Sequence, residues 1–324
     1  MTAEAASAFP PASGRRTQWS DLPASLRAAI EDRFGARVVA AESQSGGFSP
    51  GVAARLRLAD GTRAFVKAVC SSPNVDSPRM YRREARIAAA LPADVPAPAL
   101  RWSSDDGEWV VLAFDDVDGC SPELPWRADE LKRVLGAIGE LAARLAPSPL
   151  ALEPAHETMA PLFGRWRTIV DDGLESRLPA GARARLDELL AREAGWPDAV
   201  QGESLVHLDL RADNILLTPD RVFFVDWPAA AVGAAWVDLA LMLPSIAMQG
   251  GPLPEDVWQA HPLSRGVDDA HVDALVVAVA GYFAHSQMLA PPPGLPTLRA
   301  FQAAQGVRTA AWLARRLGWS DFRS

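Results

Sequence analysis

The sequence predicts an α+β protein of two lobes: a small N-terminal antiparallel-sheet lobe with one main helix, and a larger, mostly helical C-terminal lobe. Two observations lead to this prediction. Residues 37–114 hold short apolar strands joined by turn residues, whereas residues 128–317 are dominated by helical periodicity. The pattern changes near residue 117. We therefore expect a mobile tail over 1–18, an N-terminal lobe over 19–117 and a C-terminal lobe over 118–324.

Composition and charge are those of an ordinary soluble globular chain. Of the 324 residues, 49% are hydrophobic and 22% charged, and the net charge is −8. This acidic balance argues against nucleic acid as a main partner. No apolar run has the length of a membrane span, since Leu239–Met248 is short and contains Pro244. We therefore expect neither a nucleic acid nor a membrane as a partner.

The cellular compartment is predicted from the N-terminus and the cysteines. The N-terminus carries Glu4 and lacks the apolar core of a secretory signal. Cys70 and Cys120 have neither the spacing of a metal site nor that of a disulfide framework. Both observations favour a cytoplasmic protein.

The N-terminal lobe is expected to begin with a helix from Asp21 to about Phe34, with Gly35 at its C-terminal cap. A basic second helix is expected over Pro78–Leu91, with Glu84 as its only acid. The strands are expected at Arg37–Ala41, Val52–Leu58, Arg63–Val69, Leu100–Ser103 and Trp109–Phe114.

Two features of this lobe suit the phosphates of a nucleotide. The polar bend over 43–51, with Ser45, Gly46 and Gly47, can offer backbone N–H groups to phosphates, although a plain β-turn explains it as well. Lys67 lies between apolar neighbours on the strand Arg63–Val69, which returns after the turn at Asp60-Gly61. From this strand an ammonium can reach the phosphates. A solvated strand lysine is the alternative for this residue.

Glu84 and the lobe boundary extend this prediction. Glu84 is expected to pair with Lys67 and hold its ammonium in place, the alternative being i,i+4 pairs with neighbouring arginines. The segment that crosses between the lobes can offer backbone C=O and N–H groups to adenine. We assign that contact to Asp115 and Val117, with Phe114 beside the base.

The C-terminal lobe is expected to consist mainly of helices. Apolar residues recur every three and four positions between Leu131 and Leu145, which indicates an amphipathic helix. The helices are expected at Ala128–Leu145, Glu157–Leu174, Ala182–Ala194, Trp236–Met248, Pro254–Gln259, Asp269–Met288 and Thr297–Leu317.

The stretch from Leu205 to Trp227 carries the chemistry of the lobe. It contains three short apolar strands, two of them joined by a turn at Pro219-Asp220, and the pattern H-x-D-x-x-x-x-N formed by His207, Asp209 and Asn214. Asp226 follows the last strand. This arrangement is typical of a kinase catalytic loop followed by a metal-binding aspartate. The strands are expected at Leu205–His207, Ile215–Leu217 and Val222–Val225.

Each of these residue types has a chemical reason. A carboxylate at Asp209 can orient a substrate hydroxyl and accept its proton. Asn214 and Asp226 supply hard oxygen ligands suited to Mg²⁺ that also binds nucleotide phosphates. His207 is expected to brace the loop. Asp238 is expected either to begin a helix or to brace the same loop from below.

With Lys67, Glu84, Asp209, Asn214 and Asp226 in this order, residues 36–317 resemble the aminoglycoside phosphotransferase family, also called the phosphotransferase enzyme family. The specific segments are HLDLRADN, VDW and a run similar to A-x-x-G-x-x-x-x-D-L-A. The resemblance implies a two-lobed, protein-kinase-like fold and a kinase that acts on small molecules. The short segment from Asp226 to Asp238 leaves no room for a protein-kinase activation segment, which argues against a protein substrate.

The chain departs from the family pattern at several positions. Leu208 stands where the family often has a small residue, and Arg211-Ala212-Asp213 replaces His-Pro-Gly. Arg211 lies two residues beyond Asp209, where a cation can contact the transferred phosphoryl group. We hypothesise that it stabilises charge in the transition state. The bend over 43–51 matches the family only loosely.

The resemblance and the residues together predict an ATP-dependent kinase that phosphorylates a hydroxyl of a small molecule with Mg²⁺. GTP is a second candidate for the nucleotide, and no obligate protein partner is implied. The acceptor is expected to be an aminoglycoside or other antibiotic, or else a metabolite such as a sugar, choline or homoserine. A nucleotide-binding pseudokinase without turnover is the alternative from another class.

Two groups of residues were considered for the acceptor. Trp166 and Trp258 were considered for stacking on a ring, with buried packing as the alternative. Seven acids were considered as receivers of an amine-rich antibiotic, with solvated helix surface as the alternative: Asp171, Asp172, Glu175, Glu255, Asp256, Asp268 and Asp269.

Overall fold

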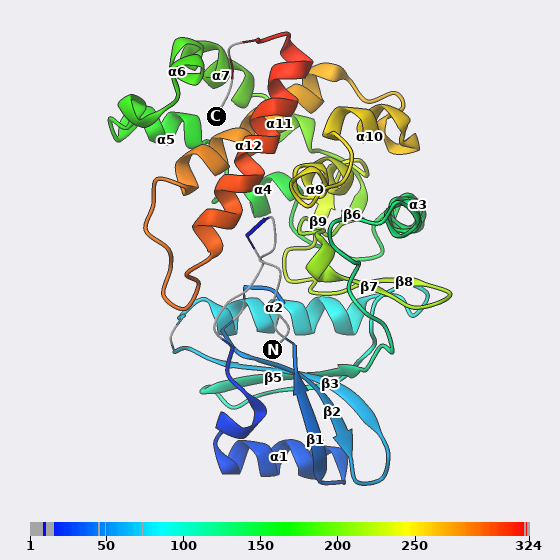
Figure 1. The fold of residues 1–324 in the computed structure, drawn as a ribbon. Coiled ribbons are helices and arrows are strands. Elements are labelled where there is room, and N and C mark those ends of the chain that lie inside the picture. Colours follow the sequence, from blue (N-terminus) through cyan, green and yellow to red (C-terminus); the bar gives the residue numbers. More distant parts are fainter. Residues whose placement is uncertain are drawn as a thin grey trace, which may run out of the picture.

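The computed structural model describes residues 9–10, 16–44, 46–48, 50–72, 74–320 and 322. Its N-terminal lobe is a five-stranded antiparallel sheet, as the sequence predicts, and the structure gives the strand order β1-β2-β3-β5-β4. The sheet lies between two helices, α1 and α2 (Figure 1). The elements are η1 Trp19–Asp21, α1 Ala24–Phe34, β1 Val38–Ser43, β2 Val52–Leu58, β3 Arg63–Cys70, α2 Ser77–Ala90, β4 Leu100–Asp105 and β5 Trp109–Asp115.

The side chains of β3 point alternately to the α1 face and the α2 face of the sheet. Val66 and Ala68 pack with Ile30 of α1 in one core cluster. Phe65 and Val69 pack in the cluster on the α2 face. Because side chains of a strand alternate between faces, Lys67 points to the α2 face with them. The two-residue period of β3 thus aims a lysine at helix α2.

The rest of the chain is mostly helical, and the fold class predicted from the sequence is confirmed. The elements are α3 Ala128–Arg144, α4 Ala155–Met159, α5 Arg165–Asp171, η2 Glu175–Arg177, α6 Ala180–Ala184, α7 Leu186–Glu193, α8 Trp196–Ala199, β6 Ser204–Val206, η3 Ala212–Asn214, β7 Ile215–Leu217, β8 Val222–Phe224, β9 Ala231–Gly233, α9 Val237–Met248, α10 Pro254–Ala260, η4 Pro262–Ser264, α11 Asp269–Ser286 and α12 Leu298–Leu317.

Two helices expected from the sequence are interrupted. The helix expected over 157–174 is divided into α4 and α5, because the chain turns at Gly164, which has φ +75°. The helix expected over 182–194 is divided between α6 and α7 at Arg185, whose φ of −116° is not helical. The apolar period continues across both breaks, so the pattern alone did not show them.

One strand pair was missed in the sequence. β6 pairs with β9, a three-residue strand that follows Trp227, whereas β7 and β8 form the expected hairpin. A strand of three residues is too short to show a two-residue period. The two pairs place the ends of β6 and β8 close together, since the imidazole Nε2 of His207 lies 3.0 Å from the carbonyl oxygen of Val225.

The core of the C-terminal lobe surrounds α9 and α11. Nearly every residue of α9 is buried, including Asp238, and most of α11 is buried as well. This packing fixes α9 directly beneath the loop that follows β6. Within the described ranges, no helix combines the length and the apolar character that crossing a membrane would require.

Candidate active site

A cavity of about 530 Å³ is lined by residues from both lobes. The N-terminal lobe contributes Gly46, Gly47, Lys67 and Glu84, and the segment between the lobes contributes Asp115 and Val117. The C-terminal lobe contributes Asn214, Asp226 and Trp227. Residues that are far apart in the sequence therefore line the same cavity. Ser45, the remaining residue predicted for the phosphate bend, lies outside the described residues.

Lys67 connects the two lobes inside this cavity. Its Nζ lies 2.5 Å from Oε2 of Glu84 and 2.7 Å from Oδ1 of Asp226. The Lys67 and Glu84 side chains are almost fully buried, while 39% of the Asp226 side chain is exposed. The ion pair between Lys67 and Glu84 that the sequence predicts is present, and Asp226 is a second partner that spacing could not show.

The charges of this triad are coupled. Burial alone would lower the pKa of Lys67, but Asp226 and Glu84 raise it above its ordinary value. Burial raises the pKa of Glu84 to about 7 despite the neighbouring ammonium. Burial also opposes ionisation of Asp226, yet Lys67 holds the pKa of that carboxyl below its usual range. Asp226 is therefore ionised and bears an oxygen toward the cavity.

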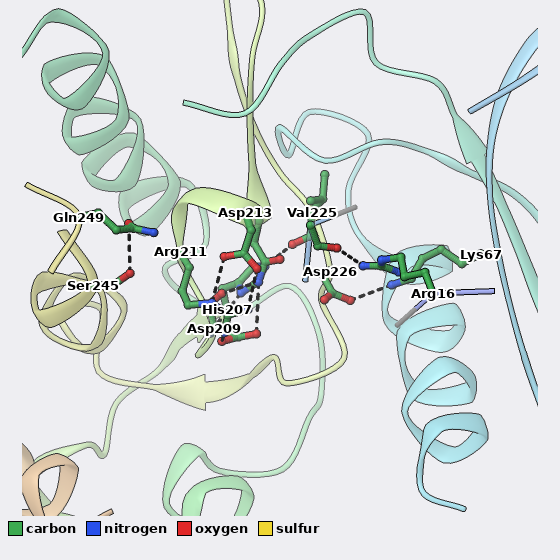
Figure 2. Close-up of polar contacts among 12 residues, drawn as sticks. Arg16, Lys67, His207, Asp209, Arg211, Asp213, Val225, Asp226, Ser245 and Gln249 are labelled. Carbon is green, nitrogen blue, oxygen red and sulfur yellow. Dashed lines mark hydrogen bonds and ion pairs between the residues drawn. The ribbon is translucent and has the colours of Figure 1, made fainter. Parts of the chain in front are cut away.

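Asp209 lies in a second cluster, formed with Arg211, Asp213 and Asn214 (Figure 2). Arg211 Nη1 donates to Oδ1 of Asp209, and Arg211 Nη2 donates to Oδ2 of Asp213 at 2.9 Å. Asn214 Nδ2 donates to the backbone oxygen of Asp209 at 2.8 Å and to its Oδ2 at 3.2 Å. The amide of Asn214 is thus oriented by Asp209 through its Nδ2, and its Oδ1 is the atom that could hold a metal ion.

Burial raises the pKa of Asp209 to about 7, although Arg211 and the amide of Asn214 lower it. Part of the Asp209 side chain is nonetheless exposed, at 39%. A carboxylate with a raised pKa and an open approach can accept a proton from a bound hydroxyl near neutral pH.

The loop that carries Asp209 is held from below by Asp238. The backbone N–H groups of His207 and Leu208 donate to the Asp238 carboxylate at 2.8 and 2.7 Å. Leu208 has φ +64°, a left-handed conformation that a leucine adopts only under constraint. Of the two readings for Asp238, bracing of the loop is the one its contacts support. The strain at Leu208 is offset by hydrogen bonds to a buried carboxylate.

His207 is buried and contacts other residues of the C-terminal lobe. Burial lowers the pKa of His207 to about 4, so the imidazole is neutral. Its ring packs on Trp227 with centroids 4.6 Å apart, and Nε2 meets the Val225 carbonyl. These contacts join the catalytic loop to the end of β8. Asp226 follows directly, with φ +68°.

The β1–β2 bend and α12 both approach Arg211. The Arg211 guanidinium carbon lies 5.8 Å from the ring centroid of Phe48 and 6.0 Å from that of Phe301. The two rings contact edge to face with centroids 5.3 Å apart. The bend is therefore packed over the same residues that surround Asp209. Sequence reasoning gave no role to Phe48, Asp213 or Phe301, because none of them stands at a fixed position of the H-x-D-x-x-x-x-N pattern.

The segment between the lobes lines the opposite side of the cavity. The backbone N–H of Asp115 donates to the carbonyl of Ala99 at 2.9 Å, and the carbonyl of Val117 accepts from Gly119 at 2.8 Å. Asp115 and Val117, which the sequence assigns to adenine, both line the cavity. Phe114, also predicted here, is one of the lining residues.

None of the residues considered for an acceptor lines the cavity described above. Trp166 and Trp258 are 1% and 4% exposed and belong to the core, so stacking on a ring was wrong for both. Glu255 pairs with Arg316 at 3.2 Å and accepts from the indole of Trp312 at 2.7 Å. Three further acids have partners within the lobe: Asp256 pairs with Arg315, Asp269 with Arg316, and Asp268 caps α11.

Comparison with known proteins identifies the family of the chain. The model of the phosphotransferase enzyme family matches residues 45–270, which is most of the chain and includes both clusters. The chain belongs to this family. A search of curated proteins found no match.

Solved structures show the same fold. An aminoglycoside phosphotransferase, APH(4)-Ia in a thermostable D198A form with ADP and hygromycin B, is 16% identical with a TM-score of 0.59, over 90% of this chain and 98% of that one. A choline/ethanolamine kinase family protein from Mesorhizobium loti is 18% identical with a TM-score of 0.56, over 91% and 97%. A protein from Haemophilus somnus 129PT, described as a candidate fructosamine-3-kinase, is 14% identical with a TM-score of 0.54, over 87% of this chain and 96% of that one.

Proposed function

We propose that this phosphotransferase transfers the terminal phosphoryl group of ATP to a hydroxyl group of a small molecule. The observation that carries the proposal is that one cavity is lined by the ion-paired residues Lys67, Glu84 and Asp226 and by Asn214. The side-chain amide of Asn214 in turn donates a hydrogen bond to the Asp209 carboxylate. The hydroxyl oxygen would form a bond to the terminal phosphorus while the bond to the bridging oxygen breaks. The hydroxyl proton would pass to the Asp209 carboxylate.

The donor atoms fit a magnesium nucleotide. Asn214 Oδ1 and the exposed part of the Asp226 carboxylate are hard oxygen ligands. Magnesium bound there would neutralise charge on the phosphates. Among the described residues, no three His, Cys, Asp or Glu side chains form a metal site by themselves. A magnesium ion at Asn214 and Asp226 would take these two protein ligands and complete its shell with phosphate and water.

The base would lie against the segment between the lobes, with the N–H of Val117 and the carbonyl of Asp115 as its partners. ATP is the proposed nucleotide and GTP the alternative. One solved relative holds ADP with hygromycin B. The acceptor of this chain is a separate question, because most of the acids on α10 and the start of α11 bind arginines of their own lobe.

The test is release of ADP from MgATP across a panel of hydroxyl-bearing compounds, including aminoglycosides, choline-like amino alcohols and sugar amines. Asp209→Asn is assayed beside the wild type. We expect one class of compound to stimulate ADP release, and Asp209→Asn to lower turnover about 10²–10⁴-fold while nucleotide affinity is retained.

The control is Asp187→Asn, which removes a carboxylate on the far side of the lobe in α7 and should leave turnover unchanged. An Asp209→Asn protein with full activity would refute the assignment of Asp209. Tight nucleotide binding without turnover on any acceptor would favour the pseudokinase alternative.

A further inference from the structure

The N-terminal segment places an arginine inside the candidate nucleotide cavity. Arg16 lines the cavity together with Gly46, Gly47 and Lys67. In Figure 2 its side chain lies with Lys67 at the Asp226 end of the group, away from Arg211. Arg16 precedes every element of the sheet and belongs to no motif. The sequence predicts a mobile tail over residues 1–18, and Arg16 stands near the end of that range.

The backbone beside Arg16 is fixed. The N–H and Oγ1 of Thr17 both lie 3.2 Å from the carbonyl oxygen of Pro50, at the end of the β1–β2 bend. Gln18 and Asp21 form a capping box at the start of η1. Thr17 therefore anchors the segment to the bend, and Arg16 enters the cavity from that anchor.

The guanidinium of Arg16 contacts the bend with one nitrogen only. Nη2 donates to the carbonyl of Gly46. At Gly47, whose φ of +83° favours glycine, a Cβ would stand 2.9 Å from that same nitrogen, so the guanidinium packs closely against the bend. The other two nitrogens, Nε and Nη1, are buried and have no hydrogen-bond partner among the described residues. Buried donors without partners are rare and call for a ligand.

The charges that line the cavity favour an anion at Arg16. The other two basic side chains are already neutralised, since Lys67 pairs with Glu84 and Asp226. Arg55 donates to the Gly119 carbonyl at 2.6 Å and lies 3.4 Å from Asp116. Arg16 has no carboxylate partner in the described part of the chain. Among the described residues that line the cavity, Arg16 is therefore the basic side chain whose charge is not already paired with a carboxylate.

We propose that Arg16 is a nucleotide-binding residue that donates to the phosphates from the N-terminal segment. This inference rests on the proposed function and adds a phosphate contact from outside the β1–β2 bend and the catalytic loop. A guanidinium suits the role because its planar array of donors matches phosphate oxygens.

The experiment is calorimetric titration of the full-length protein with ATP, ADP and adenosine, each with Mg²⁺, and with GTP in parallel. Arg16→Ala should raise the Kd for ATP and ADP about 10–100-fold. It should change the Kd for adenosine by less than about twofold, because adenosine has no phosphate. The Kd of Arg16→Lys for ATP should fall between those of the wild type and Arg16→Ala, since lysine keeps the charge without the planar donors.

Two further variants separate the possible results. Arg57→Ala removes an exposed arginine from β2, outside the cavity, and should bind like the wild type. Lys67→Ala should weaken ATP binding whether or not Arg16 takes part. If Lys67→Ala weakens ATP and Arg16→Ala does not, the role of Arg16 is refuted while the proposed function stands.

Two other results would also overturn the inference. Tighter ATP binding by Arg16→Ala would mean that the side chain blocks the cavity. Equal loss of adenosine and ATP affinity would mean that Arg16 only supports the fold of the bend. A wild-type protein that binds neither ATP nor GTP would refute the proposed function together with this inference.

Discussion

The Nζ of Lys67 lies 2.7 Å from Oδ1 of Asp226, across 159 positions of sequence. This contact joins strand β3 of the N-terminal sheet to the residue that follows the β7–β8 hairpin. Oε2 of Glu84, on α2, lies 2.5 Å from the same Nζ. An ammonium held between two carboxylates is positioned at a boundary between lobes, where a small change in their separation alters the contact.

Removal of this ammonium is expected to impair transfer more than folding. Lys67→Met should lower kcat/KM about 10²–10³-fold, the loss typical of one preorganised donor to a charged transition state. Steady-state kinetics with varied MgATP would measure it. Lys132→Met, on the exposed face of α3, is the matched control. An activity for Lys67→Met within twofold of the control would contradict the role.

Arg211 is expected to act on the transferred group. Its guanidinium stands between Asp209 and Asp213 and near the ring of Phe48, at 5.8 Å. Arg211→Ala should lower kcat about 10–10²-fold with little change in the KM for MgATP. Rapid-quench measurement of phosphoryl transfer would separate this step from product release. Turnover that is unchanged or faster would show that Arg211 serves only to pair with Asp209.

Asp238 is expected to control the shape of the catalytic loop. Asp238→Ala leaves the N–H groups of His207 and Leu208 without their acceptor, at a cost of about 2–4 kcal/mol of unfolding free energy. Urea unfolding would measure the loss. Asp256→Ala, which removes an exposed carboxylate paired with Arg315, should cost less than about 1 kcal/mol. Similar values for the two variants would dispose of the bracing role.

Glu193 should make stability depend on pH. Burial raises its pKa from 4.5 to about 7, against hydrogen bonds from the backbone at the start of α5. The side chain is nearly inaccessible, and Oε1 has no partner within the described residues. The folded protein therefore binds a proton that the unfolded chain has already lost between these pH values. The stabilisation is present below about pH 4.5 and is lost as the pH rises to 7.

The matching variant is Glu193→Gln, which cannot ionise. Between pH 5 and pH 8 the wild type should lose about 2–3 kcal/mol of unfolding free energy relative to this variant. Denaturant unfolding of both proteins at several pH values would measure the difference. Parallel pH profiles would show that Glu193 does not titrate in this range.

The local patterns of the sequence determined most elements and the polar residues of the site. The alternation along Val52–Leu58 and the turn at Asp60-Gly61 predicted β2 and β3, and the turn at Pro219-Asp220 predicted the β7–β8 hairpin. The breaks at Gly164 and Arg185 escaped, because a helical period continues through a kink. The pattern from His207 to Asn214 predicted the catalytic loop, since adjacent residues of a loop stay together in any fold.

The tertiary structure decided which distant residues meet. The second partner of Lys67, the packing of Phe48 on Phe301 and the entry of Arg16 into the cavity depend on contacts between remote segments. Such contacts are set by how sheet and helices pack, and they leave no period or spacing in the chain. The sequence by itself therefore determined the chemistry available to this phosphotransferase, and the packing of its lobes decided how those groups are combined.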